Sequence, residues 1–236
     1  MNFLSLIFPQ TVYKTTSKFS GEIKVIDHAF ERRMVVGGLT QSGGITKKMW
    51  EKALDVLSSK YKVLSIKNVL ILGLGAGTVA KVISEKYPSA KIVGIEIDSS
   101  IIDIGKKYFG SGAVKNLEIV IGDAVKMLKQ VQHDNERFDL IIVDLYKGKN
   151  IEKNVRNESF LQKMARNLEK NGIVIFNVVA IQNDNFEATI FLDKLKRIFK
   201  DNLCKRIIVN NFFFCTNPFT KGGELSMAKK KKKKKK

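Results

Sequence analysis

The chain is poor in the residues that cross-link proteins or bind soft metals. Its 236 residues include two cysteines, Cys204 and Cys215, and two histidines. The cysteines do not form a CxxC pair, and histidine is too scarce to complete a typical zinc site. We therefore expect no metal and no disulfide framework, and we interpret both cysteines as inert packing residues.

Long apolar runs are also missing. No segment approaches the roughly 18 uncharged apolar residues that a membrane-spanning helix needs. The opening MNFLSLIFPQ is apolar, but it lacks a basic start and reaches Pro9 early. We interpret it as a structural segment and not as a secretion signal. These features predict a cytoplasmic protein without a membrane partner.

Acidic residues are few relative to basic ones, 23 against 42, and the net charge is +19. Residues Lys229–Lys236 are eight consecutive lysines, so the rest of the chain carries +19 − 8 = +11. A run of like charges repels itself, and we expect residues 221–236 to be a disordered tail. The tail is either an electrostatic arm for nucleic acid or the product of a translated run of adenines. The basic body makes nucleic acid a possible partner without identifying one.

From residue 68 onward, strand and helix patterns alternate. Continuous apolar runs predict buried parallel strands at 69–75, 91–97, 117–122, 138–145 and 172–179. Helical patterns lie between and after them, at 78–86, 99–108, 124–131, 158–169 and 185–199. This alternation predicts an α/β fold with a Rossmann-like, doubly wound sheet over residues 46–220.

Shorter elements are expected at both ends of this domain. Residues 1–45 form a small β segment with strands at 21–27 and 33–36, and a helix follows at 46–60. Near the end, CKRIIVN and NFFFCT predict an antiparallel hairpin whose strands meet at Asn210–Asn211.

The sharpest motif is the glycine turn Gly73-Leu74-Gly75-Ala76-Gly77, which joins an apolar strand to a helix. Glycines at 73, 75 and 77 suit a tight turn against which a nucleoside ligand lies, because a Cβ would clash there. NAD is the first rival, but its fingerprint is GxGxxG and this turn is GxGxG. The spacing favours S-adenosylmethionine.

Two acidic positions extend this site. Glu96 ends the second strand, 19 residues after Gly77, where a carboxylate can accept hydrogen bonds from both ribose hydroxyls. Asp123 and Ala124 follow the third strand, where the Asp123 side chain can accept from the adenine amino group. Asp123 also opens a helix, so a capping role is the alternative.

These motifs resemble the class I methyltransferase fold and, more narrowly, the spermidine synthase-like family. The narrower resemblance rests on ERRMVVGGLTQSGG (31–44), KKYF (106–109), IGDA (121–124) and IIVDLYKG (141–148). It implies that Gln41 contacts the cofactor and that Asp144 is the catalytic aspartate, the first of the family's DxxD motif. A strand-end residue capping a loop is the alternative for Asp144. The resemblance also implies a homodimer.

Two departures bear on the reaction. Ala76 stands where the family has an aspartate that holds the cofactor's amino group, and Lys147 stands at the second aspartate of DxxD. A lysine in the pocket would repel a diamine by about 4 kcal/mol at 4 Å and an effective dielectric of 20. Methyl transfer requires mainly alignment of the nucleophile with the sulfonium methyl group.

We therefore expect a transferase that uses S-adenosylmethionine or its decarboxylated form on a small-molecule acceptor, with methyl transfer slightly favoured. Genuine aminopropyl transfer to a polyamine is the alternative, followed by cofactor binding without turnover. The basic charge also keeps a methyltransferase acting on nucleic acid open.

Overall fold

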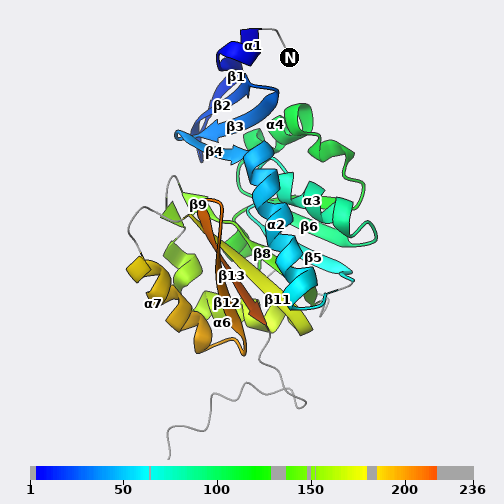
Figure 1. The fold of residues 1–236 in the computed structure, drawn as a ribbon, viewed down its shortest axis with the longest axis vertical. Coiled ribbons are helices and arrows are strands. Elements are labelled where there is room, and N and C mark those ends of the chain that lie inside the picture. The colour runs from blue at the N-terminus through cyan, green and yellow to red at the C-terminus, as the bar shows by residue number, and fades with distance from the viewer. Residues whose placement is uncertain are drawn as a thin grey trace, which may run out of the picture.

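The structure is a computed structural model, and it describes residues 4–63, 65–128, 137–147, 150–151, 153–179 and 185–216. A four-stranded sheet lies at one end of the molecule, next to a larger seven-stranded sheet with helices on both faces (Figure 1). Within the described residues, no helix is long and apolar enough to cross a membrane. The lysine tail and the predicted disorder of 221–236 lie outside the described residues.

The N-terminal sheet is larger than the sequence patterns indicate. After the short helix α1 (Leu4–Ile7) it contains β1 (Gln10–Ser17), β2 (Gly21–His28), β3 (Glu31–Val36) and β4 (Leu39–Ser42), each antiparallel to its neighbour. Only β2 and β3 were expected. The burial of β1 is shallow and its residues are mostly polar, so it lacks the apolar alternation by which strands are recognised.

The seven-stranded sheet confirms the predicted doubly wound architecture. Its strands are β5 (Asn68–Leu72), β6 (Lys91–Glu96), β7 (Leu117–Ile121), β8 (Phe138–Val143), β11 (Leu168–Val179), β12 (Asn202–Ile207) and β13 (Asn210–Thr216). They lie in the order β12-β13-β11-β8-β5-β6-β7. β11, β8, β5, β6 and β7 are mutually parallel, and β13 is antiparallel to both of its neighbours.

Alternate residues of the central strands pack against two layers of helices, one on each face of the sheet. One cluster joins α2 (Gly44–Lys60) and α3 (Thr78–Lys86) to Val69, Ile71, Leu140 and Ile142. The other joins α6 (Glu158–Asn167) and α7 (Asn185–Lys196) to Leu70, Leu72, Ile141 and Val143. This two-sided burial explains why these strands are continuously apolar.

The helix expected at 99–108 is interrupted. α4 (Ser99–Ile104) gives way to a π-helical turn, η1 (Gly105–Phe109), and a 3₁₀ turn, η2 (Ser111–Ala113). A Cβ on Gly105 would lie 2.7 Å from the carbonyl oxygen of Ala76. The helix therefore packs against the glycine turn more closely than any side chain at 105 would allow.

Several other boundaries differ from expectation. β7 is an edge strand, and Ile121 is 60% exposed, so the run at 117–122 is not buried on both faces. α5 spans Ala124–Met127, and residues 129–131 of the predicted helix lie outside the described residues. α6 ends at Asn167, and β11 begins at Leu168.

The segment after Asp144 contains two short strands and a turn. β9 (Tyr146–Lys147) pairs with β10 (Asn150–Ile151), and the 3₁₀ turn η3 spans Lys153–Arg156.

The terminal hairpin is present, but its turn is not where the sequence indicates. β12 and β13 meet through Ile208 and Val209, with Ile208 at φ +56°, and Asn210 is already a buried strand residue. Local turn preference is overridden by the register that buries the phenylalanines of β13. Both cysteines are free. Cys215 is buried, as expected. Cys204 lies opposite Phe213 in the hairpin and is exposed, so the expectation that Cys204 is a packing residue is wrong.

Asp98 joins the N-terminal sheet to the larger domain. Its Oδ1 accepts from the backbone N–H of Ser100 at 3.0 Å and caps α4. Its Oδ2 accepts from the hydroxyls of Ser17 and Ser20, at the turn between β1 and β2. Without the Asp98 carboxylate, the Ser100 N–H and the two serine hydroxyls would each lose a hydrogen-bond acceptor. Because Asp98 is buried, water would not readily replace it.

Asp98→Ala is therefore expected to destabilise the protein by about 2–4 kcal/mol, the combined worth of a helix cap and hydrogen bonds to a charged group. Amide hydrogen exchange should accelerate most over residues 10–28. Asp55→Ala is the control, because Asp55 makes an exposed ion pair with Lys86 and should cost under about 1 kcal/mol. Equal losses for the two variants in urea denaturation would contradict this role of Asp98.

Candidate functional site

The carboxyl ends of the parallel strands open into a cleft of about 550 Å³. This edge is where open α/β sheets bind ligands. Seven of the eight predicted site residues line the cleft: Gln41, Gly73, Gly75, Glu96, Asp123, Ala124 and Asp144. Gly77 does not line it. The sequence pattern therefore identified positions that the fold brings together from five separate segments.

The three glycines of the turn are needed for different structural reasons. A Cβ on Gly73 would lie 2.2 Å from the carbonyl oxygen of Asp144, and one on Gly77 would lie 2.5 Å from the Ser111 side chain. A Cβ on Gly75 would meet no protein atom within 4 Å. All three have positive φ. Gly73 and Gly77 thus permit close packing, whereas Gly75 leaves open space that faces the cleft.

Glu96 closes the turn from the end of β6. Its Oε2 accepts from the Gly75 backbone N–H at 2.8 Å, and its Oε1 accepts from the N–H groups of Ile97 and Asp98 at 2.9 and 3.1 Å. Burial raises the pKa of this carboxyl, and the three backbone donors oppose that rise. Glu96 is 8% exposed yet borders the cleft, so it both fixes the turn and forms part of the cleft wall. Its predicted contact with a ribose stays a prediction.

Gln41 reaches the cleft from β4, in the N-terminal sheet. The Ser42 and Thr78 hydroxyls hydrogen bond at 2.5 Å, which ties β4 to the start of α3 beside the glycine turn. The N-terminal sheet is thereby held beside the part of the cleft that contains the glycine turn. The contact between Gln41 and a cofactor stays a prediction.

Asp123 follows β7 and caps α5, as the alternative reading of the sequence expected. Its Oδ1 accepts from the backbone N–H groups of Val125 and Lys126, at 2.9 and 3.3 Å. The residue also lines the cleft, together with Ala124. Its Oδ2 takes no part in the cap and lies 4.0 Å from Lys126 Nζ, and the contact with adenine stays a prediction.

Asp144 lies directly after β8, and the pKa of its carboxyl is raised far above the ordinary value. Burial raises its pKa, the hydrogen bond from Asn177 opposes the rise, and the negative charge of Glu96 adds to it. The result is a pKa of about 7 instead of the ordinary 3.8. A carboxyl that titrates near neutral pH is suited to general acid–base chemistry.

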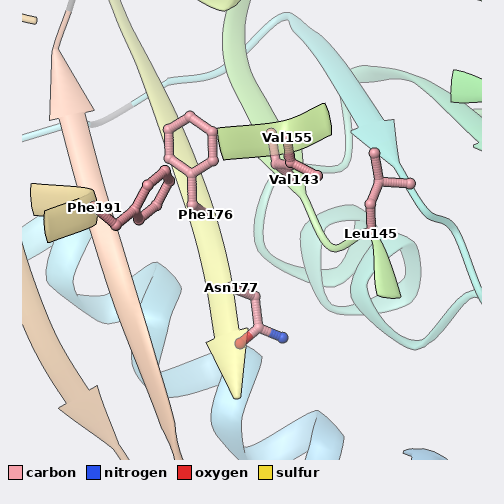
Figure 2. Close-up of a pocket in the computed structure, with 6 residues that line it drawn as sticks. All are labelled: Val143, Leu145, Val155, Phe176, Asn177 and Phe191. Carbon is pink, nitrogen blue, oxygen red and sulfur yellow. The ribbon is translucent and has the colours of Figure 1, made fainter. Parts of the chain in front are cut away.

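Asn177 was not singled out in the sequence. Its Nδ2 donates to Asp144 Oδ1 at 2.9 Å from the neighbouring strand β11. A small cavity lined by Val143, Leu145, Val155, Phe176, Asn177 and Phe191 lies beside it (Figure 2). Asn177 is the polar member of this lining, and an apolar run with one asparagine is the only signal that the sequence offered.

Tyr146 anchors the segment that follows Asp144. Its hydroxyl donates to the backbone oxygen of Asn177 at 2.8 Å and accepts from the Val179 N–H at 2.7 Å. These bonds fasten the segment after Asp144 to β11. Burial raises the pKa of Tyr146 well above its ordinary value.

The two departures from the family motif lie in different surroundings. Ala76 is 1% exposed and packs with Ile101, Ile104 and the N-terminal sheet. Lys147 belongs to β9, and only its backbone is described.

The fold and cleft define a Rossmann-like protein of the class I methyltransferase type. The spermidine synthase from Thermotoga maritima has a TM-score of 0.71 at 18% identity, over 88% of this chain and 72% of that one. Human methyltransferase-like protein 13, solved with SAH, has a TM-score of 0.58 at 21% identity, over 78% of this chain and 85% of that one. These likenesses confirm the predicted fold.

The family follows from sequence. Residues 54–236 match the model described as "Spermine/spermidine synthase domain". A protein named polyamine aminopropyltransferase from Buchnera aphidicola subsp. Schizaphis graminum is 30% identical over 91% of this chain and 72% of its own length. The chain belongs to the spermine/spermidine synthase family, as the resemblance indicated. It spans 37% and 55% of the length of two other relatives with that name.

The role of Gly75 can be separated from its backbone strain. Gly75→Ala and Gly37→Ala both place a side chain at nearly the same positive φ, +58° and +55°, in open space. Each should cost about 1–2 kcal/mol of stability. Only Gly75→Ala should weaken binding of 5′-methylthioadenosine, by about tenfold or more in calorimetric titration. Equal nucleoside affinity in both variants would remove Gly75 from the site.

The raised pKa of Asp144 predicts a pH-dependent gain of stability in Asp144→Asn. Because the folded pKa of about 7 exceeds the ordinary 3.8, wild-type stability from this group is lost as pH rises from about 4 to 7. Asp144→Asn should therefore be more stable than wild type by about 1–2 kcal/mol at pH 8, after allowance for solvent screening, and the gain should vanish near pH 4. Urea denaturation at pH 4, 6 and 8 measures it. The control Asp139→Asn, at the other end of β8, should show no gain; a pH-independent gain in Asp144→Asn would contradict the assignment.

Proposed function

We propose that the chain is an aminopropyltransferase that uses decarboxylated S-adenosylmethionine and an amine acceptor of the polyamine type. The observation that carries this proposal is the Asp144 carboxyl, which has a pKa of about 7 at the rim of the cleft. An alkylamine is protonated at neutral pH, with a reference pKa near 10.4, and it must lose a proton before it can attack. A base poised near neutral pH supplies that step.

The proposed transfer is a single nucleophilic displacement. The amine nitrogen attacks the propyl carbon bonded to the sulfonium sulfur, and that carbon–sulfur bond breaks. Methylthioadenosine leaves with the bonding electrons, and the proton of the attacking nitrogen passes to Asp144. The predicted contacts of Gln41, Glu96 and Asp123 would hold the nucleoside part.

The charge of the cleft supports a cationic acceptor. Among the described residues that line it, Glu96, Asp123 and Asp144 carry carboxyl groups, and Lys126 is the basic one. The Lys126 side chain is mostly exposed to solvent. The described lining thus favours positive ligands, although the chain as a whole is basic.

Methyl transfer, which the sequence slightly favoured, is not supported by the comparisons. The matching family model is described as a spermine/spermidine synthase domain, and two relatives that match 91% and 72% of this chain are named polyamine aminopropyltransferase and spermine synthase. Ala76 also bears less on the reaction than the sequence suggested, because its methyl group packs in an apolar cluster with Ile101 and Ile104. Aminopropyl transfer therefore replaces methyl transfer as the main proposal.

The test is a paired binding and turnover experiment on the full chain. Calorimetry should show tighter binding of decarboxylated S-adenosylmethionine than of S-adenosylmethionine. Incubation with the decarboxylated compound and putrescine, cadaverine or spermidine should release methylthioadenosine, detected by chromatography. Asp144→Asn should keep cofactor affinity and lose about 10²–10⁴-fold in turnover.

Two outcomes would overturn the proposal. The first is preference for intact S-adenosylmethionine together with release of S-adenosylhomocysteine, which is the product of methyl transfer. The second is full turnover in Asp144→Asn, which would leave the aminopropyl reaction without the base assigned to it.

A further inference from the structure

Three polar side chains on neighbouring strands form a chain of hydrogen bonds that ends at the proposed base. Asn210 Nδ2, on β13, donates to Asn177 Oδ1 at 2.8 Å. Asn177 Nδ2, on β11, donates to Asp144 Oδ1 at 2.9 Å. The sheet order β13-β11-β8 places these side chains in one line across the strands.

The register explains why Asn210 reaches Asn177. Asn210 lies opposite Val179, and Val179 is two residues beyond Asn177, so the two asparagines are diagonal neighbours on one face of the sheet. A turn at 210–211, as the sequence suggested, would have removed Asn210 from this position. The turn at Ile208–Val209 is what places its amide inside the sheet.

The direction of the hydrogen bonds follows from chemistry. An ionised carboxylate only accepts, so Asn177 must turn its NH₂ group toward Asp144 and its oxygen away. That oxygen then needs a donor, because both asparagines are about 5% exposed and water does not reach them readily. Asn210 is the donor, and it thereby favours the orientation of Asn177 that suits a charged Asp144.

We infer that Asn177 and Asn210 are positioning residues for the base: they hold the Asp144 carboxylate in one orientation and stabilise its charged form. This inference rests on the proposed function, in which Asp144 accepts the proton of the amine. Neither asparagine needs to touch the reacting atoms. The backbone around Asp144 is anchored separately by the Tyr146 hydroxyl, so the amides act on the carboxyl group itself.

Other titratable or charged groups lie around Asp144 and its neighbours, and they are unchanged when an asparagine is replaced. Glu96 from β6 acts on Asp144, Arg156 from η3 acts on Tyr146 of β9, and Asp123 and Lys126 line the same cleft. Glu96 raises the pKa of Asp144, whereas the bond from Asn177 lowers it. Loss of the amide contact must therefore raise that pKa further.

The experiment compares three substitutions of buried asparagines by leucine, which is close in size and cannot donate. Asn177→Leu removes the donor to Asp144, and Asn210→Leu removes only the donor to Asn177. Asn167→Leu is the matched control, because Asn167 is 4% exposed at the opposite end of β11 and donates to the Lys163 carbonyl.

The measurement is the acidic limb of kcat/KM against pH. We expect Asn177→Leu to shift the midpoint of the acidic limb to higher pH by about one unit or more, because it removes a hydrogen bond to a charged group. Asn210→Leu should shift the midpoint in the same direction by less. At pH 7 an upward shift of one unit from 7 lowers the ionised fraction about fivefold, and activity should recover near pH 9. Asn167→Leu should lose stability without moving the limb.

A second readout does not need turnover. Carbon-13 NMR of labelled aspartate carboxyls, with the Asp144 signal assigned from Asp144→Asn, gives the pKa of Asp144 directly in each variant. If the wild type makes no aminopropyl product but the signal still shifts in Asn210→Leu, the proposed function fails and the positioning role stands. If Asn210→Leu folds and neither its NMR titration nor its acidic limb moves, the positioning role is overturned. Asn210 is farther from the cleft, so this variant decides the matter even if Asn177→Leu does not fold.

Discussion

The close approach of two backbone segments determines the site. A Cβ on Gly73 would lie 2.2 Å from the carbonyl oxygen of Asp144, and the Asp144 N–H donates to the oxygen of Leu72 at 2.8 Å. The N–H groups of Gly73 and Leu74 both donate to the oxygen of Ile95, at 3.0 Å. The ends of β5, β6 and β8 are thus drawn together. Glu96 and Asp144 consequently border one cleft, close enough for one carboxyl to raise the pKa of the other.

The N-terminal sheet depends on the same turn from the other side. Ala76 packs its methyl group among Ile23, Val25 and Met34 of that sheet, and Gly105 touches its backbone. A charged side chain at 76 would be buried in this apolar cluster unless the sheet moved. The missing carboxylate at this position is therefore linked to how the small sheet sits on the domain, and not only to what the cofactor carries.

Local patterns predicted the parts of the fold that local forces determine. Continuous apolar runs identified β5, β6, β8 and β11, because strands covered on both faces have no polar side. The glycine turn was recognisable from its three closely spaced glycines. The sequence missed β1 and β4, whose residues are mostly polar. It also placed Asn210 in a turn, because Asn-Asn favours turns, whereas Ile208 and Val209 do not. Only the long-range pairing of β13 with β11 decides that register, so the contact between Asn210 and Asn177 had no signal in the chain.

The pKa of Asp144 fits the energetics of the proposed reaction. An ordinary aspartate near 4 would be a poor acceptor for a proton held by an amine near 10.4, with a gap of over six units. Burial narrows the gap to about three units, or about 4 kcal/mol in the ground state. The ammonium group must lose this proton before its nitrogen can attack, so the smaller gap lowers the part of the barrier that deprotonation contributes. Further burial would strengthen the base but leave it protonated at neutral pH, and the bond from Asn177 limits that rise. Burial and the hydrogen bond from Asn177 thus shift the pKa of the Asp144 carboxyl in opposite directions, and their balance keeps the carboxyl both basic and partly ionised.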